Sequence, residues 1–185
     1  MYQGKKSLNK KIEVCRSCYN KYTGYACRVE EQMVKYIQNS SLGSYIVLKD
    51  QIIKGDVCDT RRRPDLYIAS TKKLHIIVEC DEKQHQGYSE KCERGRLDEI
   101  IDEMREGRIV FIRWNPDYYQ IDGKRGLVSR KERLVTLVEF IHHIISKNDW
   151  DENNNIVLYY MYYSNDRCDL ENEFFVKHVY YKDDF

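Results

Sequence analysis

The spacing of apolar residues along the chain predicts three amphipathic helices, over about residues 28–40, 92–106 and 130–146. The apolar face of the first is formed by Val29, Met33, Val34, Tyr36 and Ile37. The second is expected to end before Gly107, since glycine commonly follows the last helical turn. The third has the clearest helical periodicity in the chain.

Shorter apolar runs predict strands around these helices. The expected strands are 45–53, 65–69, 74–81, 109–114, 156–163 and a segment near 174–181. Only the polar residues 70–73 separate the second strand from the third, which favours an antiparallel hairpin. The order of the elements is typical of an α/β sandwich with a central mixed β-sheet.

The length of 185 residues fits one domain with small additions at its ends. We expect a core over 28–148, which contains all three predicted helices. Residues 1–27 form an N-terminal extension that contains a Cys-x-x-Cys motif. Residues 149–185 form a C-terminal extension that begins with a polar linker and is rich in aromatic residues.

Charge and hydropathy narrow the possible partners. The chain has thirty-one Lys and Arg and thirty Asp and Glu, so its net charge gives no strong overall attraction to nucleic acid. Any contact with nucleic acid would therefore need a local basic patch. No apolar run approaches the roughly 18 residues of a membrane span. The lysine-rich N-terminus lacks the apolar core of a secretory signal. We therefore expect an intracellular protein, in cytoplasm or nucleus, without a membrane partner.

The chain contains seven cysteines at irregular spacing, which argues against a disulfide framework. One hypothesis is that Cys15 and Cys18 form half of a structural Zn²⁺ site. Two of Cys27, Cys58 and Cys92 would complete it. The other hypothesis is that all of these are free thiols, and a single Cys-x-x-Cys motif leaves both open.

Two short acidic runs carry the candidate chemistry, Arg-Arg-Arg-Pro-Asp at 61–65 and Ile-Ile-Val-Glu-Cys-Asp-Glu-Lys-Gln-His at 76–85. Side chains alternate along a strand, so Glu79 and Asp81 should share one face while Val78 and Cys80 take the other. Crowded carboxylates are unfavourable unless a divalent cation neutralises them. Asp65, Glu79 and Asp81 are therefore predicted to bind Mg²⁺ or Mn²⁺.

Further residues could assist hydrolysis of a phosphodiester. His85 could act as the base, because its unperturbed pKa lies near 6.5, and Lys83 could polarise water or hold a phosphate. Glu30 falls within the apolar sector of the first helix, whereas Glu31 falls outside it. The arginines expected to contact the phosphate backbone are Arg61, Arg62, Arg63 and Arg94. Taken singly, each of these residues is better interpreted as an ordinary solvated charge. An acidic pair on one strand face, beside Pro64-Asp65 and followed by His85, is much less expected by chance.

The motif Pro64-Asp65, followed by Glu79-x-Asp81 and a downstream histidine, resembles the PD-(D/E)XK (restriction-endonuclease-like) nuclease superfamily. It is most similar to the branch of the very-short-patch repair endonucleases and to relatives encoded by large DNA viruses. The likeness covers roughly 28–120. The segments that carry it are Pro64-Asp65-Leu66, Val78-Glu79-Cys80-Asp81-Glu82-Lys83-Gln84-His85, Cys92-Glu93-Arg94-Gly95-Arg96 and Val110-Phe111-Ile112-Arg113-Trp114-Asn115-Pro116-Asp117.

This resemblance implies a restriction-endonuclease-like α/β/α sandwich and Mg²⁺-dependent cleavage of DNA. It also implies Asp65 as the central metal ligand, the backbone carbonyl of Cys80 as a second ligand, and His85 as the general base. Glu30 would match the inward acid of the first helix, which positions water and metal. The resemblance itself extends to proteins of large DNA viruses, so a viral origin is one expectation.

The register of the motif leaves two interpretations. The superfamily usually has a lysine two residues after its second acid, but position 81 is Asp. Reading Asp81-Glu82-Lys83 as the acid-x-lysine element restores the lysine and moves Glu79 away from the metal. The spacing to His85 favours the Glu79 and Asp81 pair.

Two other classes of function stay open at this point. The Asp at position 81 and the near-neutral charge would also suit a catalytically inactive module that binds nucleic acid. The 16 tyrosines and the aromatic C-terminal segment would suit a protein-interaction surface, such as the face of a homodimer. Two-fold symmetry would also allow a nuclease to cut both DNA strands.

Overall fold

The structure is a computed structural model of the chain. It describes residues 2–3, 13–14, 28–51, 63–71, 73–85, 90–104, 107–146, 156–164 and 176–180. No described helix is both long enough and apolar enough to cross a membrane. The pair of two-residue strands β1 (Tyr2–Gln3) and β2 (Glu13–Val14) is antiparallel and lies in the N-terminal segment.

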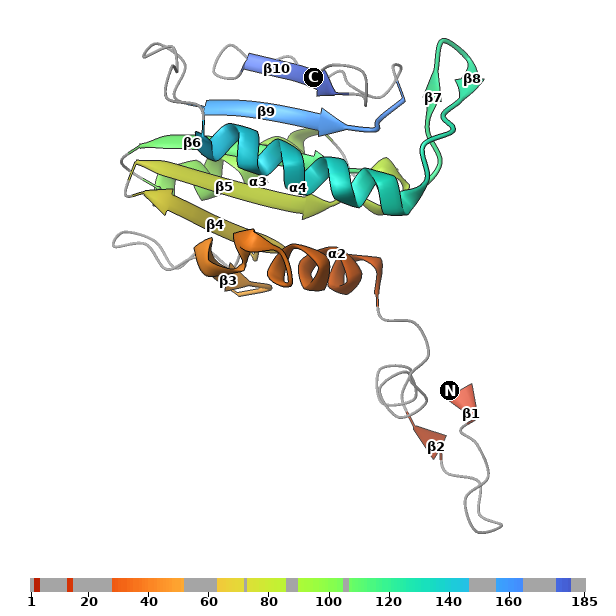
Figure 1. The fold of residues 1–185 in the computed structure, drawn as a ribbon, viewed down its shortest axis with the longest axis horizontal. Coiled ribbons are helices and arrows are strands. Elements are labelled where there is room, and N and C mark those ends of the chain that lie inside the picture. The colour runs from red at the N-terminus through yellow and green to blue at the C-terminus, as the bar shows by residue number, and fades with distance from the viewer. Residues whose placement is uncertain are drawn as a thin grey trace.

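A mixed β-sheet forms the centre of the fold, with the strand order β10-β9-β6-β5-β4-β3 (Figure 1). The strands are β3 (Ile46–Lys49), β4 (Leu66–Thr71), β5 (Leu74–Cys80), β6 (Arg108–Trp114), β9 (Ile156–Met161) and β10 (Val176–Tyr180). The pairs β3–β4 and β4–β5 are antiparallel, whereas β5, β6, β9 and β10 run parallel. The predicted α/β class, the mixed sheet and the β4–β5 hairpin are thereby confirmed.

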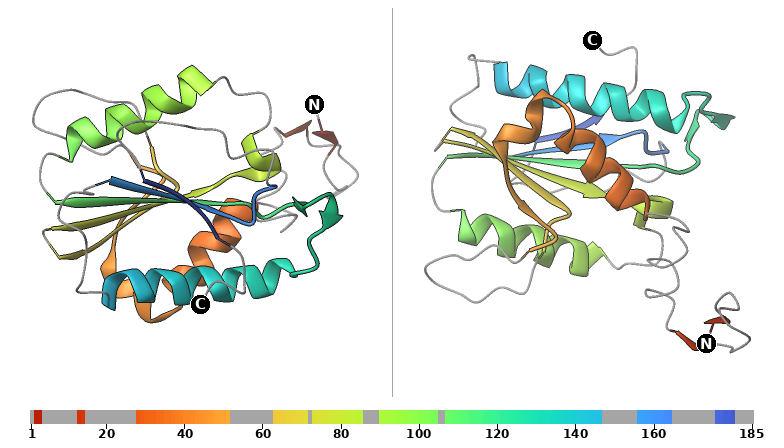
Figure 2. Two further views of the ribbon diagram at one scale, coloured as in Figure 1. Left: turned by 90° about the horizontal axis from the view of Figure 1, so that it is seen from above. Right: turned by 60° about the horizontal axis from the view of Figure 1, so that its bottom comes forward.

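Helices cover both faces of this sheet. They are α2 (Val29–Gln38), α3 (Glu90–Glu103) and α4 (Arg130–Ser146), and the last has the predicted bounds. Figure 2 shows α2 and α4 on one face and α3 on the other. The fold is therefore a three-layer arrangement in which the sheet is buried between helices.

Two apolar clusters fill the spaces between the layers, and the strands alternate between them. In β5, Val78 and Cys80 belong to the cluster under α2 and α4, while Ile77 belongs to the cluster under α3. In β6, Ile112 and Phe111 alternate in the same way. Burial on both faces explains the apolar run over residues 109–112 in β6, and each such side chain contributes roughly 1.5–3 kcal/mol.

The segment before β3 differs from the prediction of one long strand over 45–53. A short 3-10 helix, η1 (Ser41–Tyr45), precedes a four-residue strand. Ser40 caps it, since its Oγ accepts a hydrogen bond from the Leu42 N–H at 3.2 Å. Gly43 is required here because a Cβ would lie 2.3 Å from the Gln38 carbonyl oxygen. Residues 52 and 53 lie outside the described part of the chain.

The segment over 118–128, between β6 and α4, contains a small hairpin, β7 (Gln120–Ile121) and β8 (Lys124–Arg125). Its turn is Asp122-Gly123, and both residues have positive φ, 49° and 74°. An Asp-Gly pair with two positive φ angles is typical of the tight turns that match strand twist. The two-residue strands were too short to give an alternating pattern in the sequence.

The C-terminal strands belong to the same sheet as the predicted core. β9 pairs along its whole length with β6, and its residues are buried in both clusters. Tyr36, which was expected on the apolar face of α2, is instead 36% exposed. Of the other predicted members, Met33, Val34 and Ile37 are buried, and Val29 is partly buried.

Candidate functional site

The acidic residues of both sequence motifs lie at one edge of the sheet. Asp65 immediately precedes β4 and Asp81 immediately follows β5. Because the two strands are antiparallel, the start of one and the end of the other meet. β3 ends at the same edge, where the N–H of Asp50 donates to the carbonyl oxygen of Asp65 at 3.3 Å.

The carboxylate of Asp65 is held against the end of β5. Its Oδ2 accepts a hydrogen bond from the backbone N–H of Cys80 at 2.7 Å. Cys80 itself is a buried free cysteine. Burial raises the pKa of its thiol, and the nearby carboxylates of Asp65 and Asp81 raise it further. The thiol therefore stays protonated and packs as a small apolar side chain.

A group of carboxylates gathers near Cys80 on the α2 side of this edge. Glu30, in the first turn of α2, is partly buried, whereas Glu31 is exposed and pairs with Lys35 at 3.9 Å. Burial raises the pKa of Glu30 most, the negative charges of Asp50, Glu31 and Glu82 raise it further, and the positive charge of Arg28 lowers it. Carboxylates from a helix, from the end of β3 and from the end of β5 thus repel one another here.

A buried ionic network occupies the α3 side of the same edge. Both Arg113 Nε and the Tyr163 hydroxyl donate hydrogen bonds to Oδ2 of Asp81, which is fully buried. The Arg113 guanidinium also lies 5.9 Å from the ring centre of Tyr160. Burial raises the pKa of Tyr163 well above its usual value, and the charge of Asp81 adds to this effect. The network fixes the end of β5 to β6 and to the segment after β9.

The alternation of β5 places Glu79 on the same side as Asp81, opposite to Val78 and Cys80. Glu79 is buried and is in register with Arg113 of the parallel neighbour β6. Among the described residues, no three His, Cys, Asp or Glu side chains lie close enough together to form a metal-binding group. The predicted acids are brought to one edge but are divided between the two sides of β5.

The short helix η2 (Glu82–His85) follows the acids and has an unusual backbone. Lys83 and Gln84 have positive φ angles of 56° and 54°, which cost on the order of 1–3 kcal/mol each. Asp117 Oδ2 accepts the Lys83 N–H at 2.9 Å, and Ser164 N–H donates to Gln84 Oε1 at 2.8 Å. Lys83 therefore lies beyond the end of β5, and its side chain is exposed.

Other predicted site residues are placed only in part. His85 is the last residue of η2, Arg94 lies in α3, and Arg63 is exposed before β4. The side chains of His85 and Arg94 are outside the described part of the structure, as are Arg61 and Arg62. The zinc prediction at Cys15 and Cys18 also falls outside it and stays a prediction.

The sequence reasoning missed Asp50, Glu82, Arg113 and Tyr163. Arg113 could have been found, because an arginine in an otherwise apolar strand needs a buried carboxylate partner. Asp50 was hidden inside the strand that was predicted to continue to residue 53. Tyr163 depends on the path of the chain after β9, which local sequence does not specify.

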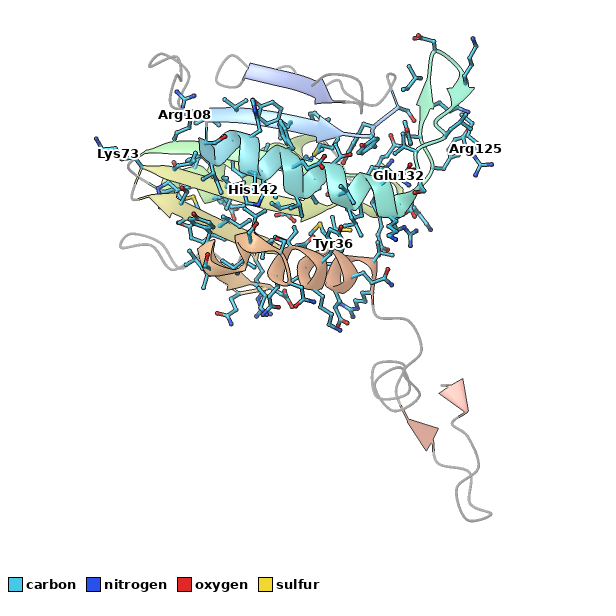
Figure 3. The ribbon with its side chains drawn as sticks, in the orientation of Figure 1. Tyr36, Lys73, Arg108, Arg125, Glu132 and His142 are labelled. Atoms are coloured by element: carbon cyan, nitrogen blue, oxygen red, sulfur yellow. The ribbon has the colours of Figure 1, made fainter. Side chains whose placement is uncertain are left out.

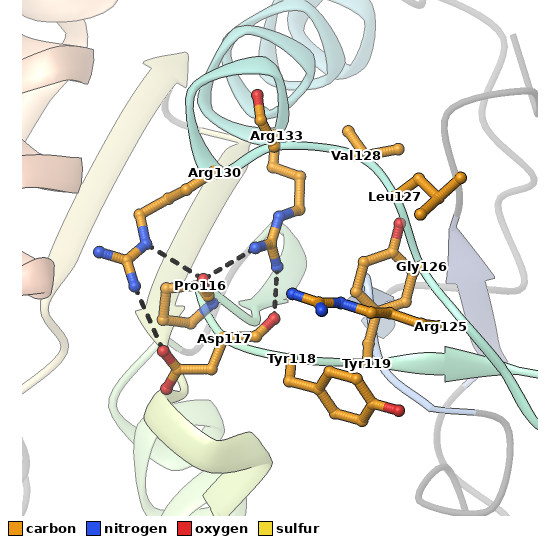
Figure 4. A pocket seen from close by; sticks show the side chains of 11 residues that line it. Pro116, Asp117, Tyr118, Tyr119, Arg125, Gly126, Leu127, Val128, Arg130 and Arg133 are labelled. Atoms are coloured by element: carbon orange, nitrogen blue, oxygen red, sulfur yellow. Dashed lines mark hydrogen bonds and ion pairs between the residues drawn. The ribbon is translucent and has the colours of Figure 1, made fainter.

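A cavity of about 470 Å³ opens next to η2 at the same end of the sheet. Its wall includes the turn after β6, which Arg133 of α4 holds through three backbone carbonyls. Arg133 donates to the carbonyl oxygens of Asp117 at 2.8 Å and Pro116 at 2.9 Å, as Figure 4 shows. It also donates to the carbonyl oxygen of Asn115 at 2.7 Å. Burial lowers the pKa of this arginine, and the carbonyls compensate for its lost hydration.

Comparison of the chain with protein-family models, with curated proteins and with solved structures finds no match. Two features distinguish this edge of the sheet. One is the group of carboxylates around Glu30, and the other is the arginine-rich cavity beyond η2.

Proposed function

We propose that the protein is a metal-dependent DNA endonuclease with a restriction-endonuclease-like α/β/α core. One observation carries the proposal: Asp65 is fixed by the Cys80 N–H at an edge where further carboxylates gather from α2, β3 and β5. An acidic group of this kind at a strand end is suited to metal-assisted hydrolysis of a phosphodiester. The exposed basic residues nearby supply charge for a phosphate backbone.

The carboxylates at this edge are the type of oxygen donor that a hard divalent cation binds, and the described side chains would have to move closer together to hold one. The pKa of Glu30 is raised by burial and by neighbouring carboxylates, and a cation with oxygen ligands would relieve that repulsion. Asp65 would be its central ligand, with Glu30, Glu82 and the Cys80 carbonyl as further candidates, whereas the predicted ligand Glu79 lies on the opposite side of β5. A bound Mg²⁺ or Mn²⁺ would neutralise charge at the scissile phosphate and lower the pKa of its water.

The protein's own residues have separate roles in this proposal. Asp65 is oriented by its hydrogen bond to Cys80. Asp81, engaged by Arg113 and Tyr163, positions the end of β5 rather than contacting substrate. Lys83 presents its exposed ammonium beside the site for a phosphate, and His85 at the end of η2 is the candidate general base.

The test is cleavage of plasmid, nicked, mismatched and branched DNA in Mg²⁺ or Mn²⁺. Asp65→Asn keeps the shape of the side chain but removes its charge, and we expect it to lower the cleavage rate at least about a hundredfold. Glu30→Gln should lower it less. Glu31→Gln, an exposed acid on the same helix, is the matched control and should cleave normally. Absence of cleavage of every substrate by the wild-type protein, or full activity of Asp65→Asn, would refute the proposal.

A catalytically inactive nucleic-acid-binding module is the second candidate. The observation in its favour is that Asp81, at the position of the superfamily lysine, is committed to Arg113. Such a module would bind DNA equally well with and without divalent ions. A cation-dependent rise in melting temperature that Asp65→Asn abolishes would instead support the enzyme.

A further inference from the structure

The cavity beyond η2 is rich in arginine. It lies between the turn after β6, the β8 strand and the first turn of α4, and Figure 4 shows arginines from β8 and α4 around it. Its charged lining residues are Arg125, Arg130, Arg133 and Asp117. Because three guanidinium groups and only one carboxylate line the cavity, it is suited to bind an anion.

The three arginines differ in how far they are already engaged. Arg133 is buried and bonds three carbonyls. Arg130 donates to the Pro116 carbonyl oxygen at 3.1 Å and pairs with Asp117 at 3.3 Å. In the part of the chain that the structure describes, no hydrogen bond or ion pair holds the guanidinium of Arg125, which lies 5.8 Å from the ring centre of Tyr118. Arg125 is therefore the cation available to a ligand.

Apolar and aromatic side chains are exposed beside this cation. Tyr118 is 52% exposed and Leu127 is 90% exposed, and both line the cavity. A large exposed aromatic next to an arginine is unfavourable for solubility but favourable for stacking a nucleobase, while the guanidinium binds the adjoining phosphate. A free anion such as inorganic phosphate would make no use of Tyr118 or Leu127.

The cavity is linked to the candidate active site by hydrogen bonds. Asp117, in its wall, accepts the Lys83 N–H, and the Tyr118 carbonyl accepts a hydrogen bond from Gln84 Nε2 at 3.0 Å. The acids of β5 and the cavity thus flank the same short helix, η2. A nucleotide in the cavity would belong to a strand that passes the acidic edge.

We propose that this cavity binds an unpaired nucleotide of the DNA substrate, with the base against Tyr118 and a phosphate on Arg125. The inference rests on the proposed endonuclease function and specifies its substrate as DNA with a single-stranded, mismatched or branched position. A volume of about 470 Å³ is within the range of small-molecule sites and accommodates one nucleotide. The net charge of +1 agrees with a local site rather than a duplex-wrapping surface.

The test measures the affinity of the full-length protein for a fluorescent 12-nucleotide oligo(dT) in EDTA, so that no cleavage occurs. We expect oligo(dT) to bind more tightly than a duplex of equal length. Arg125→Ala and Tyr118→Ala should each weaken binding roughly fivefold to a hundredfold, the range of one lost stacking or phosphate contact. Tyr118→Phe keeps the ring and should bind normally.

Two exposed residues far from the cavity serve as matched controls, Lys73→Ala for the arginine and Tyr36→Ala for the tyrosine (Figure 3). Unchanged affinity in Tyr118→Ala and Arg125→Ala, equal losses in the controls, or equal binding of inorganic polyphosphate would overturn the inference. Tighter binding of oligo(U) would assign the cavity to RNA and overturn it too.

The outcome is separable from that of the proposed function. If the wild-type protein cleaves DNA but Tyr118→Ala and Arg125→Ala bind oligo(dT) normally, the nucleotide site is refuted and the endonuclease proposal stands. Conversely, Tyr118-dependent binding without any cleavage would refute the endonuclease alone.

Discussion

Arg113 of β6 donates a hydrogen bond from Nε to Oδ2 of Asp81, and both residues are buried where β5 and β6 end. The hydroxyl of Tyr163 donates to the same oxygen. A charged group of this kind is stable inside a protein only when its partner is present. The pair therefore fastens the acid-bearing end of β5 to its neighbour, and the candidate site depends on it for its shape.

Removing one partner of this pair should lower the free energy of unfolding far more than replacing both partners. Asp81→Ala leaves the Arg113 charge buried without its carboxylate, so we expect a loss of about 3–5 kcal/mol in the free energy of unfolding. The double variant Asp81→Leu with Arg113→Met replaces both charges with apolar side chains and should recover most of that loss. Urea unfolding of the single and double variants measures the difference. Equal destabilisation in both would contradict the buried-pair interpretation.

The raised pKa of Tyr163 predicts a loss of stability in alkali. The folded protein holds the phenolic proton more tightly than the unfolded chain, whose tyrosines titrate near pH 10. The stabilisation is complete below that pH and decreases as pH rises above it, by at most roughly 1.4 kcal/mol per pH unit. Tyr163→Phe removes this titration but also loses about 1 kcal/mol of hydrogen bonding at neutral pH.

Urea unfolding of wild type and Tyr163→Phe at several pH values between about 8 and 11 tests this sign. The two stabilities should converge as pH rises, because only the wild type loses the contribution of Tyr163. A constant difference in stability between them across this range would show that the pKa of Tyr163 is not raised in the folded protein.

Much of the fold follows from local pattern. The third helix matches α4 at both ends, and the polar gap over 70–73 correctly predicts the β4–β5 hairpin. Alternation also places Val78 and Cys80 in the cluster opposite to Ile77. These features depend on residues close in sequence, where periodicity and turn chemistry are decisive.

The site was predicted less completely because its partners come from distant parts of the chain. Asp81 was interpreted as a metal ligand, but its nearest partners are Arg113 and Tyr163, 32 and 82 residues further along. Strand alternation predicts the face of the sheet on which a side chain lies. It does not predict which residue of a neighbouring strand will contact that side chain. Asp50 joins the acidic group only because β3 is just four residues long and ends at Lys49.

Neutralising Glu30 should stabilise the protein at neutral pH. The pKa of Glu30 is raised by burial and by Asp50, so its ionised form is disfavoured in the folded state. This cost in stability is absent below the ordinary pKa of 4.5, where the carboxyl is protonated in both the folded and the unfolded state. Glu30→Gln should therefore gain up to about 1 kcal/mol at pH 7, since water screens a half-exposed carboxylate, and gain nothing near pH 4. Added Mg²⁺ should raise the melting temperature of wild type more than that of Glu30→Gln. Glu31→Gln is the control, and a gain of the same size there would contradict this prediction.

Two glycines should respond oppositely to alanine. At Gly107, φ is +101° and an added Cβ would lie 2.8 Å from the Lys73 carbonyl oxygen, which also accepts the Arg108 N–H at 2.7 Å. We expect Gly107→Ala to lose about 1–3 kcal/mol. Gly95, inside α3, has no atom within 4 Å of an added Cβ, so Gly95→Ala should gain roughly 0.5–1 kcal/mol. Thermal or urea unfolding of the two variants measures both signs, and a stabilised Gly107→Ala would refute the close approach at that turn.

Arg133 should be irreplaceable by lysine, although both are cations. Its planar guanidinium bonds three carbonyls of the 115–117 turn and lies 5.4 Å and 5.6 Å from the ring centres of Tyr119 and Tyr162. A lysine ammonium cannot reach the three oxygens in that plane or stack between the rings, so Arg133→Lys should cost about 2–3 kcal/mol. Arg130→Lys, at an exposed ion pair on the same helix, should cost less than about 1 kcal/mol.

Replacing Arg133 by lysine should also affect binding, because the turn holds η2 through Asp117. Arg133→Lys should weaken oligo(dT) binding even at temperatures where circular dichroism shows that the variant is fully folded. A folded Arg133→Lys protein with wild-type stability would show that the turn does not depend on the guanidinium.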